Sequence, residues 1–278
     1  MGGNGSGDGG WGGIAAGGAV RWTYVFVDRP VAGFERACAF WTAVTATELS
    51  EPRGEQGEFV TLLPETGDAC VKAQGVVSGD GGAHPDLAVE DVPAFVDRAV
   101  RLGAGVVAPH DGWAVLRSPA GQLFCAVPWH GESVRPPVVE GSRLDQVCLD
   151  VAPDRFEGEV AFWAALSGWE SHPGSLPEFH VLRPPAGLPL RILLHRLDTP
   201  RPASAHLASA HLASAHPASA HLDLACADID TTRAHHEALG ATFVARHPHW
   251  TVMRDPAGGT YCLTGRSPET GGLPPSAG

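Results

Sequence analysis

The chain has 278 residues, of which 44% are hydrophobic, and this is enough to build the packed cores of two domains of ordinary size. Its formal net charge is −12 at pH 7, with 19 basic and 31 acidic side chains. Such an acidic chain, without a run of lysine or arginine, is expected to bind neither nucleic acid nor an anionic membrane.

Segment 1–19 is rich in glycine, and we expect it to be a disordered tail because it cannot bury enough surface to offset its conformational entropy. It lacks the charged start and apolar stretch of a signal peptide, and no apolar run in the chain approaches the roughly 20 residues that span a bilayer. The six cysteines are scattered and form no CxxC pair. These features predict a reduced, cytoplasmic setting, and the arginine-rich composition indicates a bacterial source.

The remaining pattern is that of strands and helices in a regular order. Alternating β-forming residues predict strands, and apolar residues at helical spacing predict helices. In chain order the first half gives a strand, a helix and two strands, then a strand, a helix, a strand and a hairpin around the turn sequence SPAG. The corresponding residues are 21–28, 34–44, 57–64 and 69–77, followed by 84–91, 92–104, 106–109, 113–117 and 123–127.

The second half repeats the first. RWTYVFVDRPVAGFERACAFW aligns with RLDQVCLDVAPDRFEGEVAFW at an offset of 122, which pairs Asp28 with Asp150 and Trp41 with Trp163. HPDLAVEDVPAFVDRAVRLGA aligns with HLDLACADIDTTRAHHEALGA at an offset of 137, which pairs His84 with His221. Each half therefore holds two strand–helix–strand–strand–strand units, and the two halves should share one architecture.

The difference between the offsets, 137 − 122 = 15, identifies residues 203–217 as an insertion. The insertion is built from the five-residue unit ASAHL, and its histidines His206, His211 and His216 have no counterparts in the first half. A five-residue step places these side chains on no common helix face, and lengthening a surface loop costs little. We therefore expect an irregular loop rather than a metal-binding ladder.

These patterns divide the chain into a tail, two domains, a linker and a second tail. The expected boundaries are 1–19 for the first tail, 20–130 for the first domain, 131–141 for the linker, 142–266 for the second domain and 267–278 for a flexible carboxyl-terminal tail.

The paired units and their motifs resemble the vicinal oxygen chelate superfamily, and in particular its glyoxalase-like members. The features that carry the resemblance are a helix ending in FW, a strand H-x-D-L followed by D-[VI], the helix end LGA, and R-[SD]-P-A-G-x-x-[FY]-C. The resemblance covers about residues 20–265, once in each half. It implies an α+β fold of four βαβββ modules that form two tandem domains, and it is weak evidence for any one activity.

Metal-dependent members of the superfamily carry four ligands on matched strands, usually His or Gln, Glu, His and Glu. Carried over, these positions fall near Tyr24, Gln74, His84 and Cys125 in the first half, and near Gln146, His195, His221 and Cys262 in the second. Neither set contains the carboxylates that Mg²⁺ or Mn²⁺ prefers. The second set offers two imidazoles and a thiol, so any metal, with zinc the best match, is expected at His195, His221 and Cys262.

Several other residues are candidates for a functional role, and each also has a structural explanation. Trp113 with Arg117, and Trp250 with Arg254, alternate onto one strand face and could line a pocket or simply belong to the core. Asp86 and Asp223 share a strand face with His84 and His221 and could orient the imidazoles or act as a base, or simply make structural hydrogen bonds. Phe40-Trp41 and Phe162-Trp163 should pack helix against sheet, and His235-His236 should be solvated.

Three functions fit these observations. The first is a small-molecule-binding, glyoxalase-like protein that lacks the usual metal and needs no cofactor. The second is a metal-dependent lyase, isomerase or dioxygenase that uses the second half. The third is a drug-binding protein of the bleomycin-resistance kind. The expected partner is a small organic ligand, and the chain should be a monomer or a homodimer.

Overall fold

The computed structural model describes residues 18–198 and 218–273. The predicted insertion 203–217 and almost all of the predicted amino-terminal tail lie outside this part of the chain. Within the described residues, the helices are too short or too polar to cross a membrane.

The first half is one eight-stranded sheet with two α-helices. The strand order is β2-β3-β4-β1-β5-β8-β7-β6, with β1 parallel to β4 and antiparallel to β5, and β5 parallel to β8. The elements are β1 (Val20–Pro30), η2 (Val31–Gly33), α1 (Phe34–Thr45), β2 (Thr47–Leu49), β3 (Phe59–Pro64), β4 (Val71–Val76), β5 (Gly82–Val89), α2 (Val92–Arg101), β6 (Gly105–Pro109), β7 (Ala114–Arg117) and β8 (Leu123–Pro128).

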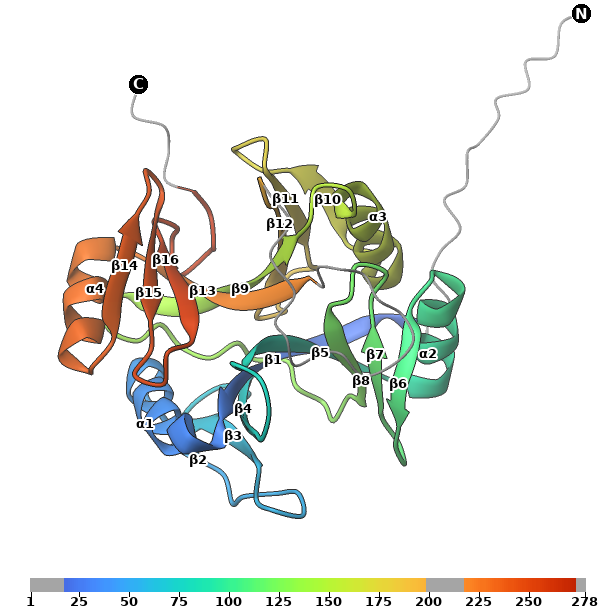
Figure 1. Ribbon diagram of the computed structural model, residues 1–278, viewed down its shortest axis with the longest axis horizontal. Coiled ribbons are helices and arrows are strands. Elements are labelled where there is room, and N and C mark those ends of the chain that lie inside the picture. Colours follow the sequence, from blue (N-terminus) through green and yellow to red (C-terminus); the bar gives the residue numbers. More distant parts are fainter. Residues whose placement is uncertain (1–17, 199–217, 274–278) are drawn as a thin grey trace, which may run out of the picture.

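The second half repeats this arrangement in the order β10-β11-β12-β9-β13-β16-β15-β14, so the two H-x-D-L strands, β5 and β13, hold the same sheet position. Figure 1 shows the two sheets with their helices on the outside. The fold is therefore the expected α+β tandem of βαβββ modules. The elements are β9 (Ser142–Val151), α3 (Phe156–Ser167), β10 (Glu170–Pro173), β11 (Phe179–Arg183), β12 (Arg191–Arg196), β13 (Ser219–Cys226), α4 (Ile229–Ala238), β14 (Thr242–Arg246), β15 (Trp250–Arg254) and β16 (Thr260–Thr264).

The repeated motif D-[VI] starts the second helix of each half. The side chain of Asp91 accepts a hydrogen bond from the Ala94 backbone N–H, and Asp228 accepts one from Thr231, so each aspartate caps a helix amino terminus. Each cap lies just after β5 or β13, where the chain leaves the sheet and begins a helix.

The two halves are joined at two seams, each made of a helix from one half and a turn from the other. At the first seam α1 lies against the β15–β16 turn, and at the second α3 lies against the β7–β8 turn (Figure 1). Aromatic rings fill both seams: Trp41 packs on Tyr261 with ring centroids 5.3 Å apart, and Trp163 packs on Phe124 at 4.9 Å. The repeated Phe-Trp pairs thus pack helix against sheet as expected, but across the halves.

A buried carboxylate lies at each seam. The turn supplies it at the first seam, and the helix supplies it at the second. At the first seam Asp255 in the turn accepts from the Trp41 indole at 3.1 Å and pairs with Arg29 at 2.7 Å. At the second seam Glu159 on α3 accepts from the Trp163 indole at 2.7 Å and from the Ala120 N–H in the turn at 2.8 Å. The repeat aligns Asp255 with Ser118, and Glu159 with Ala37.

One expectation about the surface is wrong. His236 on α4 is only 1% exposed, because its Nδ1 lies 2.9 Å from the Tyr261 hydroxyl and its ring meets Phe40 of the other half edge-on at 5.6 Å. The helix face that carries it is covered by the first seam, which the pattern of α4 alone does not show. His235 beside it is half-buried.

Candidate functional site

The predicted site residues share one face of each sheet, together with residues two positions away on the same strands. We name these faces the first cup (Tyr24, Phe26, Asp28, Lys72, Gln74, His84, Asp86, Cys125) and the second cup (Gln146, Cys148, Asp150, Leu193, His195, His221, Asp223, Cys262). Asp28 pairs with Gln74 in the first sheet, and Asp150 pairs with His195 in the second. Gln74 and His195 are therefore equivalent positions, although they lie 121 residues apart rather than the 122 of the strands they pair with.

The first cup is filled by its own side chains. The Tyr24 hydroxyl donates to Glu132 at 2.6 Å, and the Lys72 ammonium lies 3.8 Å from the centroid of the Tyr24 ring. Phe26 stacks on His84 with ring centroids 4.6 Å apart. Tyr24, itself one of the predicted ligand positions, thus fills the first cup together with Phe26 and Lys72.

The polar groups of the first cup form a closed network. His84 Nδ1 lies 2.7 Å from Asp28, His84 Nε2 lies 3.7 Å from Asp86, and Asp86 pairs with Lys72 at 3.3 Å. Burial lowers the pKa of His84, but the carboxylates of Asp28 and Asp86 outweigh it and raise that pKa overall. His84 here is an ion-pairing residue held by two carboxylates.

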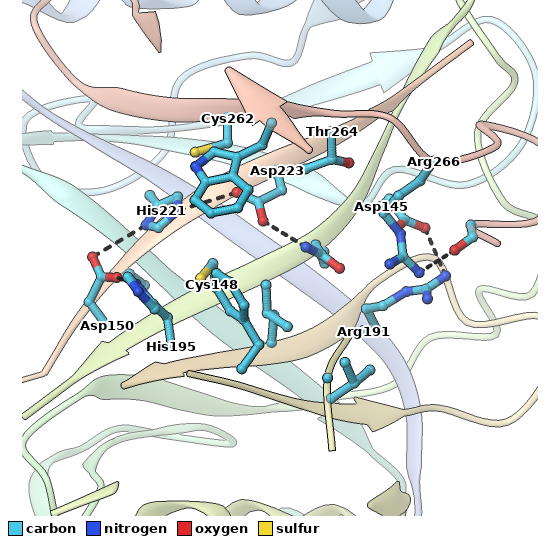
Figure 2. Close-up of a pocket in the computed structure, with 18 of the residues that line it drawn as sticks. Asp145, Cys148, Asp150, Arg191, His195, His221, Asp223, Cys262, Thr264 and Arg266 are labelled. Atoms are coloured by element: carbon cyan, nitrogen blue, oxygen red, sulfur yellow. Dashed lines mark hydrogen bonds and ion pairs between the residues drawn. The ribbon is translucent and has the colours of Figure 1, made fainter. Parts of the chain in front are cut away.

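The second cup is open. At the positions of Phe26 and Lys72 it carries the smaller Cys148 and Leu193, as the strand registers show. Both residues line a cavity of about 1540 Å³ (Figure 2), larger than the roughly 300–1,000 Å³ of typical small-molecule pockets. Its wall includes the ring of Phe179, which stacks on His195 at 4.7 Å and meets Trp250 edge-on at 5.6 Å.

A chain of carboxylates and imidazoles crosses the second cup. Asp150 lies 2.8 Å from His195 Nδ1 and 3.5 Å from His221 Nδ1, and His221 Nε2 lies 3.3 Å from Asp223 (Figure 2). Gln146 donates to Asp223 at 2.7 Å. Gln146 lines the cavity, and its Oε1 atom is buried without a hydrogen-bond partner in the part of the chain that the structure describes.

The protonation of this chain follows from burial and charge. Burial lowers the pKa of His221, but contacts with Cys148, Cys262, Asp223 and Asp150 outweigh it and raise that pKa well above its ordinary value. Burial raises the pKa of the Cys148 and Cys262 thiols. The cup therefore places an imidazole with a raised pKa between two carboxylates and beside two thiols whose pKa values are also raised.

Two groups of side chains place possible metal ligands within 4.8 Å of one another: His84, Asp86 and Cys125 in the first cup, and Cys148, His221 and Asp223 in the second. His195 lies outside the second group, and Asp150 contacts both His195 and His221. The nitrogen, sulfur and single carboxylate of the second group suit Zn²⁺ better than Mg²⁺ or Mn²⁺. Sequence reasoning missed Cys148 and Asp150, although they follow Gln146 at the two-residue spacing that puts side chains on one strand face.

Of the two predicted tryptophan–arginine pairs, the structure places one tryptophan in the cavity wall. Trp250 lines the cavity and stacks on His247 at 4.4 Å, whereas Arg254 is exposed and outside the lining. Trp113 stacks in the same way on His110 at 3.9 Å, and Arg117 is half-buried. Of these four residues, Trp250 is the one placed to contact a ligand of the second cup.

Both halves match one family model, described as a glyoxalase-like domain, over residues 24–127 and 146–264. No curated protein matches the sequence.

Solved structures share the two-domain architecture at low sequence identity. A variant of 4-hydroxymandelate synthase from Streptomyces coelicolor is 13% identical, with 89% of this chain and 92% of that chain covered and a TM-score of 0.55. 2,2',3-Trihydroxybiphenyl 1,2-dioxygenase from Sphingomonas wittichii is 13% identical over 88% and 90% of the two chains, with a TM-score of 0.57. The 2,3-dioxygenase LapB from Pseudomonas is 12% identical over 90% and 93%, with a TM-score of 0.57. At these identities the likeness shows the fold alone.

Proposed function

Because the chain belongs to the glyoxalase-like domain family of the vicinal oxygen chelate superfamily, with one domain in each half, we propose that it binds a small organic molecule in its second cup. The observation that carries this proposal is the difference between the cups. Tyr24, Phe26 and Lys72 fill the first, while Gln146, Cys148 and Leu193 leave the second open. A concave, partly aromatic cavity with a few convergent polar groups is the usual form of a ligand site.

The test uses the first cup as the template for closing the second. In Cys148→Phe, the new ring takes the place that Phe26 holds above His84 and should block the cavity above His221. A set of small aromatic and aliphatic fragments, neutral and anionic, is screened by ligand-observed NMR against wild type and this variant. We expect fragments that bind wild type and lose binding in Cys148→Phe.

The matched control is Cys125→Ala in the first cup, which should leave fragment binding unchanged. Fragments that bind Cys148→Phe as well as they bind wild type would show that the second cup is not the site. A drug-binding protein of the bleomycin-resistance kind would use the same cavity, and the chemical class of the bound fragments separates it from other binders.

A metal-dependent reaction in the same cup is the second candidate, favoured by the convergence of Cys148, His221 and Asp223. A zinc ion held there would supply a Lewis acid at the cavity floor. Around it, Gln146 would orient Asp223 through their 2.7 Å hydrogen bond, and Asp150 would orient the His221 ring. The cavity above would position the substrate.

Elemental analysis of the purified protein tests this candidate and its ligand set. The sequence assigns a metal to His195, His221 and Cys262, whereas the structure groups Cys148 and Asp223 with His221. Zinc that is lost in His221→Ala and Cys148→Ala but kept in His195→Ala would identify the group seen in the structure. Loss in His195→Ala and retention in Cys148→Ala would identify the set expected from sequence. Stoichiometric zinc that survives all three changes would place it elsewhere.

A further inference from the structure

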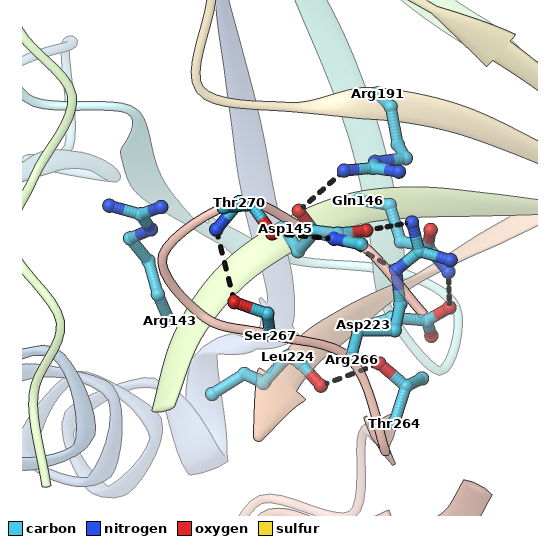
Figure 3. Close-up of polar contacts among 12 residues, drawn as sticks. Arg143, Asp145, Gln146, Arg191, Asp223, Leu224, Thr264, Arg266, Ser267 and Thr270 are labelled. Atoms are coloured by element: carbon cyan, nitrogen blue, oxygen red, sulfur yellow. Dashed lines mark hydrogen bonds and ion pairs between the residues drawn. The ribbon is translucent and has the colours of Figure 1, made fainter. Parts of the chain in front are cut away.

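One end of the second cup carries more positive than negative charge. Asp145 Oδ1 lies 3.1 Å from Arg191 Nη2, and Asp145 Oδ2 lies 3.0 Å from Arg266 Nε (Figure 3). The carboxylate is 2% exposed and the two arginine side chains are 13% and 14% exposed. Two guanidinium groups thus share one carboxylate, which leaves about one positive charge in a largely buried place where charge is costly unless paired.

A β-bulge builds this arrangement. In β9, Leu144 pairs with Leu224 and Gln146 pairs with Asp223, so Asp145 is the extra residue between them. A bulge lets neighbouring side chains turn to the same side of a sheet, and both Asp145 and Gln146 line the cavity. In β1 the register shift falls instead between Val20 and Trp22.

We call Asp145, Arg191 and Arg266 the charged trio, and the first half has no counterpart of it. The repeat places Thr23 at the position of Asp145, Cys70 at that of Arg191 and Trp129 at that of Arg266. The same three positions in a fold-equivalent sheet therefore carry no charge, so the fold itself does not require the trio. Its presence coincides with the open cup.

Donors remain for a ligand at this end. The Nε and Nη1 atoms of Arg191 donate to none of the residues that the structure describes, whereas Arg266 Nη2 also donates to the Gly271 carbonyl. Burial, with Arg266 and Arg183 nearby, lowers the pKa of Arg191 to about 10, so it stays protonated at neutral pH. Gly271, whose backbone lies against the Arg191 guanidinium, has φ +66°, a conformation that favours glycine.

We propose that Arg191 and Arg266 bind a carboxylate group of the organic molecule that occupies the second cup. This inference rests on the proposed function. Guanidinium groups match the planar geometry of a carboxylate, and one negative charge balances the surplus of the trio. Figure 2 shows this end on one side of Cys148 and Asp223, with His195 and His221 on the other. The body of the ligand would extend from the arginines toward the histidines and the Phe179 wall.

Matched pairs of carboxylic acids and their primary amides test this assignment. Phenylacetate with phenylacetamide, and 3-phenylpropionate with its amide, are titrated into wild type by calorimetry at low and high NaCl. We expect each acid to bind about tenfold or more tightly than its amide, as for charge-assisted hydrogen bonds, and its affinity to fall with added salt. The amide affinities should not change with salt.

Two variants change the preference in opposite directions. Arg191→Gln should bring acid and amide to within about threefold of each other, and Asp145→Asn, which removes the compensating charge, should strengthen acid binding. Arg254→Gln, exposed and outside the cavity, is the control and should keep the wild-type preference.

The outcomes separate this inference from the proposed function. Acids and amides that bind wild type equally, without salt dependence, would overturn the carboxylate site and leave ligand binding in the second cup standing. If neither series binds, and no fragment of the earlier screen binds, both proposals fail.

Discussion

Asp255 is a fully buried carboxylate that contacts four partner residues. It pairs with Arg29, accepts from the Trp41 indole, and its other oxygen accepts from the backbone of Ala257 and Gly259. A buried ion pair adds little stability compared with apolar packing, but removing one partner leaves an uncompensated charge. The stability of the first seam therefore depends on keeping both ions.

We expect Asp255→Asn to lower the free energy of unfolding by about 3–5 kcal/mol, because Arg29 stays buried and charged without its partner. The matched change at the second seam, Glu159→Gln, should cost no more than about 2 kcal/mol, since burial already raises the pKa of Glu159 and no arginine of residues 18–198 and 218–273 pairs with it. Urea denaturation of both variants measures the difference. Equal losses would contradict the importance of the Arg29 charge.

His236 makes the free energy of unfolding depend on pH. Burial, with a contribution from His235, lowers its pKa to about 4, so between pH 6.5 and 4 the unfolded chain binds a proton that the folded chain excludes. Stability from this residue is complete above pH 6.5 and is lost as the pH falls, by up to about 3 kcal/mol at pH 4. In His236→Gln, urea midpoints at pH 7, 5.5 and 4.5 should fall less than in wild type. Parallel slopes would show that His236 is not responsible.

At the scale of the element, the equivalent strands β1 and β9 carry side chains of different size at one matched position. Phe26 in β1 closes its cup, and Cys148 in β9 leaves its cup open. Phe26→Cys should therefore cost about 3 kcal/mol, because it leaves a cavity between His84 and Phe59. Cys148→Phe should cost less than about 1.5 kcal/mol, because its ring enters existing space. Chemical denaturation of the two variants checks this asymmetry, and a larger loss in Cys148→Phe would contradict it.

The sequence predicts most elements because their signals are local. The apolar alternation of β1, the capping aspartates Asp91 and Asp228 and the SPAG turn each act within a few residues. The short edge strands β2 and β10 were not located, since three or four mostly exposed residues carry no alternation to recognise. Repeat offsets also predicted that the two sheets would share one strand order.

The site was predicted only in part, because its key contacts join residues far apart in the chain. His221 and Asp223 were expected together on one strand face, and the structure places them 3.3 Å apart. The trio of Asp145, Arg191 and Arg266 depends on a bulge, which shifts the register of β9 by one residue and leaves no mark in the hydrophobic pattern. The burial of His236 depends on the other half of the molecule, which no local pattern reports.

At the scale of the whole molecule, the two halves share their cores. Phe124 of the first half packs on Trp163 of the second, and Tyr261 of the second half packs on Phe40 and Trp41 of the first. Separating the halves would expose these rings and the buried charges at both seams. Each half therefore depends on the other for its stability.

We expect one cooperative unfolding transition for the full chain, because neither half keeps a closed core without its partner. Differential scanning calorimetry should show a single peak, and Asp255→Asn should shift the whole peak to lower temperature. Two resolved peaks, with only one displaced by the substitution, would show that the halves unfold independently.

The placement of the seam carboxylates has a consequence for self-association. The first half contributes neither carboxylate, since it carries Ala37 and Ser118 at the matched positions, and the second half contributes both, Glu159 and Asp255. Two first halves paired with each other would leave both indole N–H groups without an acceptor, and two second halves would bury two acids at each seam. Only the unlike pair has one acid at each. The two halves are therefore complementary rather than self-complementary: the second half supplies both buried acids, and the first half supplies none.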